Sequence, residues 1–244
     1  LIFLVFSTIS LSQNLKADGQ KIVDGNGNEV LLRGYAPGGW LLIEGYMMHE
    51  SGGSVGAQHE IKENLVELMG TDKTEEFFKK WRENHFTKRD VDSLASWGFS
   101  SIRVPLHYNL FTLPIQDEPV SGENTWLDEG FNIIDNVLNW AKPHKMYVIL
   151  DLHAAPGGQG RNTDISDYDP DKPSLWESEQ NKNKTVALWR KIAERYKDNE
   201  WIGGYDLLNE TNWDLPEGKA LKDLFVRITN CLLYTSDAAD ELLG

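Results

Sequence analysis

The sequence is poor in cysteine, in clustered basic residues and in long hydrophobic runs. Its one cysteine, Cys231, leaves no internal disulfide bond and no cysteine-ligated metal site. A net charge of −14 over 244 residues, without a stripe of lysine and arginine, argues against a nucleic-acid partner. The histidines also lack metal-ligand spacing such as His-Glu-x-x-His. We therefore expect no metal and no other cofactor.

The two ends differ from the rest of the chain. Residues 1–11 are apolar, too short to span a bilayer and followed by polar residues, which is typical of a secretory signal peptide. We assign residues 1–17 to a partial signal peptide, with a buried strand as the alternative. We expect a secreted protein, extracellular or periplasmic, that is not membrane-bound after signal cleavage. Residues 231–244 resemble the translation of an adapter used in sequencing-library preparation, so we treat them as non-native.

The remaining residues, 18–230, alternate strands and helices after a hairpin. Asp24-Gly25 and Asn26-Gly27 predict the hairpin turn. Apolar runs then predict four buried strands, and Pro105 is expected to end the second of them because proline cannot donate to a ladder. Helical spacing predicts the segments between the strands. The strands are expected at 30–36, 101–105, 146–153 and 203–208, and the helices at 58–69, 74–86, 87–97, around 134–141, at 184–196 and at 217–229.

Strands that alternate with helices predict a parallel sheet with right-handed crossovers. Two α/β folds compete, a doubly wound sheet and a (β/α)8 (TIM) barrel. A dinucleotide-binding sheet would carry G-x-G-x-x-G after its first strand, but Ala36-Pro37-Gly38-Gly39 stands there. We therefore predict a (β/α)8 barrel of which only about the first four β/α units are present. The first and fourth strands would then be open edges.

Four polar residues fall at the carboxyl ends of predicted strands, where barrel enzymes place their chemistry. They are Arg103, His153, Asn209 and Glu210. Each also has a simpler interpretation: an ion pair for Arg103, a hydrogen-bonded strand end for His153, a turn cap for Asn209 and a solvated carboxylate for Glu210. Because parallel strand ends meet at one rim, we expect the four side chains to converge.

The motifs around these residues resemble glycoside hydrolase family 5, the cellulase family. They are Ile102-Arg103-Val-Pro105, Ile149-Leu-Asp-Leu-His153-Ala-Ala-Pro-Gly and Tyr-Asp-Leu-Leu-Asn209-Glu210. Gly38-Gly39-Trp40-Leu-Leu-Ile-Glu44 and Gln159 resemble the exo-glucanase-like branch of that family. The resemblance covers about residues 30–229 and implies a chain truncated at both ends.

The resemblance implies a retaining β-glycoside hydrolase acting on β-glucans such as cellulose or β-1,3-glucan, as a monomer. It gives Glu210 the role of general acid/base and Asn209 that of binding the sugar 2-hydroxyl. His153 would border the cleaved sugar, and Arg103 would lie beside the nucleophile. Glu44 and Gln159 become substrate-binding candidates. Trp40 and Trp213 are candidates for stacking on sugars, with core packing as the alternative.

The nucleophile of this family is expected beyond residue 230. Asp151 and Asp206 lie within strands, where we expect structural hydrogen bonds instead of a catalytic role. A retaining mechanism needs two carboxylates about 5–5.5 Å apart, so we expect this chain to be inactive by itself. A non-catalytic carbohydrate-binding protein on the same fold is the alternative, and a metal-dependent barrel hydrolase is a third hypothesis.

Overall fold

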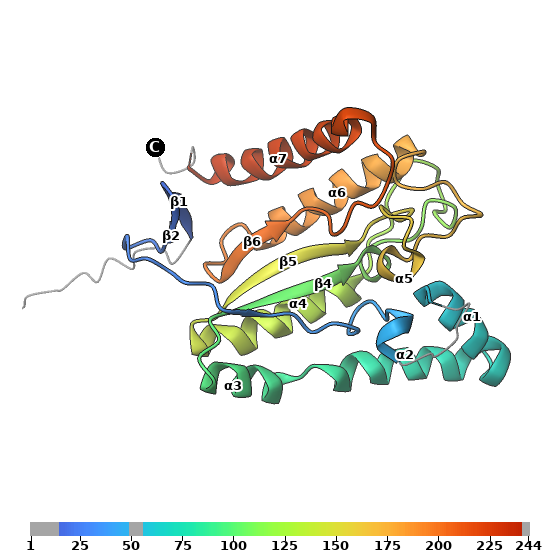
Figure 1. Cartoon of the computed structure of the whole chain (residues 1–244), viewed down its shortest axis with the longest axis horizontal. Coiled ribbons are helices and arrows are strands. Elements are labelled where there is room, and N and C mark those ends of the chain that lie inside the picture. The colour runs from blue at the N-terminus through green and yellow to red at the C-terminus, as the bar shows by residue number, and fades with distance from the viewer. Residues whose placement is uncertain (1–14, 49–55, 241–244) are drawn as a thin grey trace, which may run out of the picture.

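The computed structural model describes residues 15–48 and 56–240, so most of the predicted signal peptide lies outside the described residues. Two strands, β1 (Lys16–Asp18) and β2 (Lys21–Val23), form an antiparallel hairpin. Four parallel strands form the main sheet in the order β3-β4-β5-β6 (Figure 1). They are β3 (Gly34–Tyr35), β4 (Ser101–His107), β5 (Tyr147–Ala154) and β6 (Ile202–Asp206).

Helices connect each main strand to the next, and α7 follows β6 beside α6 (Figure 1). Every strand therefore pairs with its neighbour in sequence through a helical crossover, as the strand–helix pattern predicts. The α-helices are α1 (Gln58–Met69), α2 (Thr71–His85), α3 (Lys88–Ser96), α4 (Asp128–Ala141), α5 (Thr163–Ser166), α6 (Glu179–Tyr196) and α7 (Lys219–Asp240). Short 3-10 helices lie at η1 (Gly45–Met48), η2 (Tyr108–Leu110), η3 (Lys142–His144) and η4 (Pro216–Gly218).

The core lies between the two central strands and the helices that cover them. In β4 and β5 almost every side chain is buried, as expected for parallel strands enclosed on both faces. Each large apolar side chain buried there contributes about 1.5–3 kcal/mol. The predicted inward face of α4 is confirmed, with Ile134, Val137, Leu138 and Ala141 buried. That of α6 is confirmed too, with Trp189, Ile192, Ala193 and Tyr196 buried.

The two outer strands are less buried than the sequence predicts. Strand β3 covers only two of the residues expected at 30–36, and Tyr35 is 43% exposed. All of β6 is half-buried. Both strands have one neighbour in the described sheet, whereas β4 and β5 each have two. The expectation that the first and fourth strands are edges is confirmed, and the expectation of full burial is wrong for both.

Pro105 does not end its strand, because β4 continues to His107 with Pro105 opposite Asp151. The pairing with β3 stops at Ile102. Beyond that point β4 has β5 as its only partner, so a proline can face the unpaired side without removing a ladder hydrogen bond.

The predicted hairpin turn is present: Asp24 and Asn28 pair through their backbones, and Val23 bridges Glu29. At the other end, residues 231–240 continue α7, and Cys231 is buried. The origin of residues 231–244 stays a prediction. Within residues 15–48 and 56–240, no helix has both the length and the apolar character needed to cross a membrane.

Candidate active site

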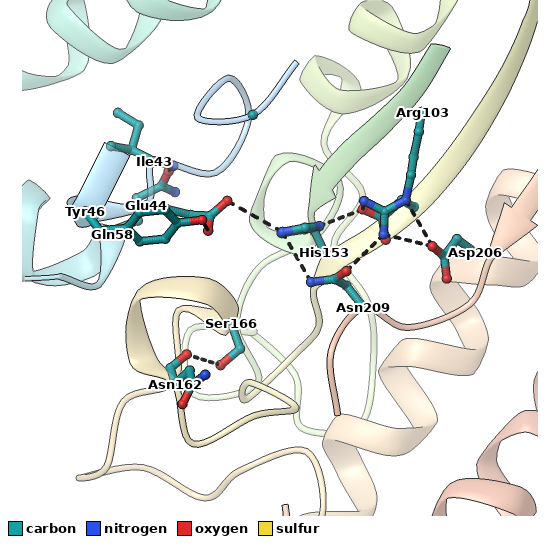
Figure 2. Close-up of polar contacts among 12 residues, drawn as sticks. Ile43, Glu44, Tyr46, Gln58, Arg103, His153, Asn162, Ser166, Asp206 and Asn209 are labelled. Carbon is teal, nitrogen blue, oxygen red and sulfur yellow. Dashed lines mark hydrogen bonds and ion pairs between the residues drawn. The ribbon is translucent and has the colours of Figure 1, made fainter. Parts of the chain in front are cut away.

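Three of the predicted rim residues lie in direct contact (Figure 2). His153 comes from the carboxyl end of β5, and Asn209 from the segment that follows β6. The prediction that Arg103 lies at a strand end is wrong, because β4 continues for four residues beyond it to His107. Nη2 of Arg103 donates to Oδ1 of Asn209 over 2.9 Å, and Nδ2 of Asn209 lies 3.3 Å from Nε2 of His153. The three side chains therefore converge as predicted, with Arg103 reaching the other two from within its strand.

Arg103 also joins two aspartates. Its Nε and Nη2 atoms donate to Oδ2 of Asp206 over 3.1 and 2.8 Å, and Nη1 lies 3.1 Å from Oδ2 of Asp151. The guanidinium group thus ties β5 and the end of β6 to β4. Asp151 and Asp206 have the structural hydrogen bonds that the sequence predicts for them.

His153 lies between two carboxylates. Nδ1 is 2.6 Å from Oδ2 of Asp151, and Nε2 is 3.6 Å from Oε1 of Glu44. Burial alone would lower the pKa of His153, but the hydrogen bond to Asp151 and the contact with Glu44 raise it to about 9. When protonated, Nε2 donates toward Glu44; when neutral, it accepts from Asn209.

Asp151 is fully buried, and its Oδ1 atom has no hydrogen-bond partner among the described residues. Burial raises the pKa of Asp151, against the opposing effects of His153 and Arg103. A buried carboxylate with one free oxygen is costly, and the contacts with His153 and Arg103 offset that cost.

Glu44 reaches this rim from the long segment between β3 and α1, and it is 5% exposed. Oε2 accepts from the hydroxyl of Tyr46 over 2.6 Å. Burial first, and then the Glu44 carboxylate, raise the pKa of Tyr46 well above its usual range. Gln58, at the start of α1, accepts from the backbone N–H of Ile43 through Oε1 over 2.8 Å, which fixes the chain just before Glu44. Figure 2 shows this group beside His153.

Gln159 has no exposed surface and contacts backbone only. Nε2 donates to the carbonyls of His153 and Asn209 over 2.6 and 3.0 Å, and Oε1 accepts from N–H of Ala155 over 3.1 Å. In this structure Gln159 therefore positions two rim residues through their backbones, and its side chain offers no surface to a sugar.

Glu210 is exposed and directly follows the buried Asn209. Its backbone has φ of 28°, in the left-handed region that non-glycine residues rarely adopt. N–H of Asn209 donates to the carbonyl of Leu152 over 3.0 Å, and N–H of Asn212 donates to the carbonyl of Glu210 over 2.9 Å. These contacts hold the strained residue on both sides while its carboxylate faces solvent.

The two tryptophan candidates have different surroundings. Trp40 is 2% exposed, packs on Phe86 with ring centroids 5.1 Å apart and donates through Nε1 to the carbonyl of Arg82. It belongs to the core, which was the alternative from sequence. Trp213 is partly exposed, and the guanidinium carbon of Arg161 lies 4.7 Å from its ring centroid.

Within the described residues, no group of three or more histidine, cysteine, aspartate or glutamate side chains has the geometry of a metal site. The carboxylates closest to the rim are already bonded: Glu44 to Tyr46, Asp151 to His153 and Asp206 to Arg103. Glu210 is exposed, and no ion pair or side-chain hydrogen bond holds its carboxylate among the described contacts, whereas the partly exposed Asp206 is held by Arg103.

Comparison with known families agrees with the motifs. The model of the cellulase family, glycosyl hydrolase family 5, matches residues 60–237. The chain belongs to glycosyl hydrolase family 5. A β-xylosidase of Phanerodontia chrysosporium is 39% identical over 197 residues, which are 80% of this chain and 39% of that protein. A "Probable glucan 1,3-beta-glucosidase A" of Aspergillus clavatus is 27% identical over 186 residues, which are 75% of this chain and 41% of that protein.

The rutinosidase of Aspergillus niger has a similar fold, with a TM-score of 0.60 and 18% identity over 81% of this chain and 59% of that chain. With four parallel strands and their helices, this family 5 chain has part of a (β/α)8 barrel, which confirms the predicted fold class. It spans about two fifths of the length of these two curated relatives.

Two contributors to the site were not predicted from sequence. Tyr46 and Gln58 both fix Glu44; Tyr46 lies in a segment without regular periodicity, and Gln58 is the first residue of a predicted helix, whose spacing says nothing about a contact with Ile43. The one available signal for Tyr46 was its position two residues after Glu44.

Proposed function

We propose that this family 5 chain comes from a retaining β-glycoside hydrolase that cleaves β-glucans such as cellulose or β-1,3-glucan. The observation that carries the proposal is the contact chain Arg103–Asn209–His153 with the exposed Glu210 directly beside it. The substrate class has support from curated relatives whose names include glucan 1,3-beta-glucosidase and endoglucanase.

In this proposal Glu210 is the general acid/base. Its exposed carboxyl group protonates the leaving glycosidic oxygen and later takes a proton from the attacking water. The fixed backbone on either side of Glu210 limits the positions that this carboxyl group can reach, and such positioning contributes to rate.

Asn209 binds the 2-hydroxyl of the cleaved sugar, a contact that strengthens toward the transition state. Arg103 orients the amide by occupying Oδ1, which leaves Nδ2 as the donor end. A sugar hydroxyl near Nδ2 would also be within reach of His153 and Glu44, so the three side chains form one polar wall. The placement of Arg103 beside the nucleophile stays a prediction.

We infer that the chain alone does not hydrolyse glycosides. A second carboxylate is needed about 5–5.5 Å from the acid, and the rim carboxylates other than Glu210 are held by Tyr46, His153 and Arg103. Trp213 stays a candidate for stacking on a sugar, because it is only partly buried. We propose that the protein is a secreted monomer.

The test compares the product of the extended gene with its Glu210→Gln variant on laminarin and on cello-oligosaccharides. Loss of the acid is expected to lower kcat by at least about 100-fold, since general acid catalysis supplies about 10²–10⁴-fold. Glu217→Gln, which changes another exposed carboxylate seven residues later, is the matched control and is expected to keep full activity.

Equal turnover in Glu210→Gln and Glu217→Gln would refute the assignment of the acid. Binding of oligosaccharides without turnover by the extended protein would favour the alternative, a carbohydrate-binding protein. Hydrolysis by the 244-residue chain itself would contradict the proposed inactivity.

A further inference from the structure

A second polar cluster lies outside the rim, around Asp167 in the loop that follows β5. Oδ1 of Asp167 accepts from the backbone N–H of His59 over 2.8 Å and lies 2.7 Å from Nδ1 of the same residue. Oδ2 lies 2.9 Å from Nε2 of His107, the last residue of β4. One carboxylate therefore joins three segments that are far apart in the sequence.

The hydrogen bond that His107 accepts shows which group is the donor in its contact with Asp167. N–H of Asn109 donates to Nδ1 of His107 over 3.1 Å, so Nε2 carries the proton and donates to Asp167. Burial alone would raise the pKa of Asp167, but the contacts with His107 and His59 hold it well below its usual range. The hydrogen bond to Asp167 likewise raises the pKa of His59. All of these contacts favour an ionised Asp167.

The conformation of Asp167 is a strained one. Its φ of 50° lies in the left-handed region, and the side chain is only 10% exposed. Such a conformation persists when the surrounding contacts determine it, and here both carboxylate oxygens are used. Helix α5, which directly precedes Asp167, packs closely on the segment before α1, because a Cβ added to Gly56 would lie 3.1 Å from Cβ of Asp164.

Hydrogen bonds attach the start of α1 to the residues on either side of Glu44. His59 is the second residue of α1, and Gln58 before it bonds N–H of Ile43. N–H of Gly45 donates to the carbonyl of Gly56 over 2.9 Å. The residues on both sides of Glu44 are thus attached to the segment that Asp167 holds.

The geometry points to Asp167 as a positioning residue: through His59 it fixes the start of α1, and through α1 it holds Glu44 and Tyr46 against His153. The consequence for sugar binding rests on the proposed function, in which Glu44 and His153 form one wall of the site. The contact chain itself does not depend on that proposal and can be tested on the 244-residue chain without substrate.

The test uses Asp167→Asn, with Asp169→Asn as its matched control. Asp169 lies two residues away in the same loop and bonds N–H of Asp171 and Nζ of Lys172. Glu44→Gln serves as the reference for direct loss of the Glu44 charge. The readouts are the titration midpoint of the His153 ring by NMR and the hydrogen exchange of the Ile43 and Gly45 amides.

In Asp167→Asn we expect the Glu44 carboxylate to move away from His153. The titration midpoint of His153 should then fall from about 9 by about one pH unit, as in Glu44→Gln. Exchange of the Ile43 and Gly45 amides is expected to accelerate at least about tenfold. Asp169→Asn is expected to change neither. A lower melting temperature in Asp167→Asn with an unchanged His153 titration would mean that Asp167 only braces the fold, and would overturn the proposal.

If Asp167→Asn does not fold, Gln58→Leu tests the last link, because it removes the bond to Ile43 and leaves Asp167 and His59 in place. The proposal then requires the same downward shift of the His153 titration. No shift in Gln58→Leu, with a clear shift in Glu44→Gln, would equally overturn it. Neither result depends on hydrolysis, so the outcome is separate from the test of Glu210.

Discussion

Oδ1 of Asn209 accepts a hydrogen bond from Nη2 of Arg103 over 2.9 Å, although the two residues are 106 positions apart. This contact determines which end of the amide faces the rim. With Oδ1 occupied, Nδ2 is turned toward His153 and toward the space where a sugar hydroxyl would lie. The long side chain of Arg103 reaches Asn209 from within β4, and the guanidinium group makes the contact directional.

Arg103→Met is expected to lower the free energy of unfolding by about 3 kcal/mol. The reason is that the fully buried Asp151 loses one of its two cationic neighbours and keeps only His153, and breaking a buried pair costs about 3–5 kcal/mol. Urea unfolding measures the effect. The control is Arg195→Met, which breaks an exposed pair with Asp135 and is expected to cost about 0–1 kcal/mol. Similar losses in both variants would show that Arg103 stabilises the fold no more than a surface arginine.

The stabilising effect of His153 is expected to disappear as the pH rises from about 6.5 to about 9. The pKa of His153 is about 9 in the folded chain and 6.5 without its partners, so the folded state binds a proton that the unfolded state releases in this range. The contribution is complete below pH 6.5 and is lost as the pH passes the folded value. The unfolding free energies of the parent and His153→Gln, measured between pH 6 and pH 10, should converge with rising pH. A constant difference would contradict the raised pKa.

Gly157→Ala is expected to cost about 3 kcal/mol or more. The glycine has φ of 81°, which costs an L-residue about 1–2 kcal/mol, and an added Cβ would lie 2.8 Å from the carbonyl of Pro173. Gly122→Ala isolates the first effect, because its φ is 86° and nothing lies within 4 Å of the added atom. Thermal unfolding should show the larger loss for Gly157→Ala, with about 2–4 °C for each kcal/mol. Equal losses of stability in the two variants would mean that the residues around Gly157 move to accommodate the methyl group at no cost.

Gln159→Glu is expected to destabilise the fold by about 3 kcal/mol or more, because the carbonyls of His153 and Asn209 lose their donors and a carboxylate is buried in their place. Gln180→Glu makes the same change on the exposed face of α6 and is expected to stay within about 0.5 kcal/mol of the parent. Chemical denaturation of both variants provides the comparison. Unchanged stability in Gln159→Glu would show that the amide does not support the rim.

The sequence predicts the repeat of strands and helices well, because periodicity reports burial within one element. The inward faces of α4 and α6 follow directly from the spacing of their apolar residues. The expected burial of β3 and β6 was wrong because it depends on how many neighbours a strand has. Apolar composition cannot report that number.

The meeting of His153 and Asn209 could be predicted from their places at strand ends, whereas Arg103 reaches them from within β4. The contacts of Asp167 could not, since its partners are 108 and 60 positions away and none lies in a shared motif. For Gln159 the sequence does contain a motif, but the motif does not predict what the side chain contacts. Its motif predicts a group that binds substrate, whereas the structure shows an amide that hydrogen-bonds the backbones of His153 and Asn209.

Asn209-Glu210-Thr211 also has the sequence of an acceptor for N-linked glycosylation. In the folded chain the nitrogen to which a glycan would be attached lies 3.3 Å from His153, in a residue that is 7% exposed. Because Asn209 is buried, its folded environment leaves little space for a glycan. In a eukaryotic secretory pathway, the fate of each molecule at this residue would depend on whether folding or glycan transfer reaches Asn209 first.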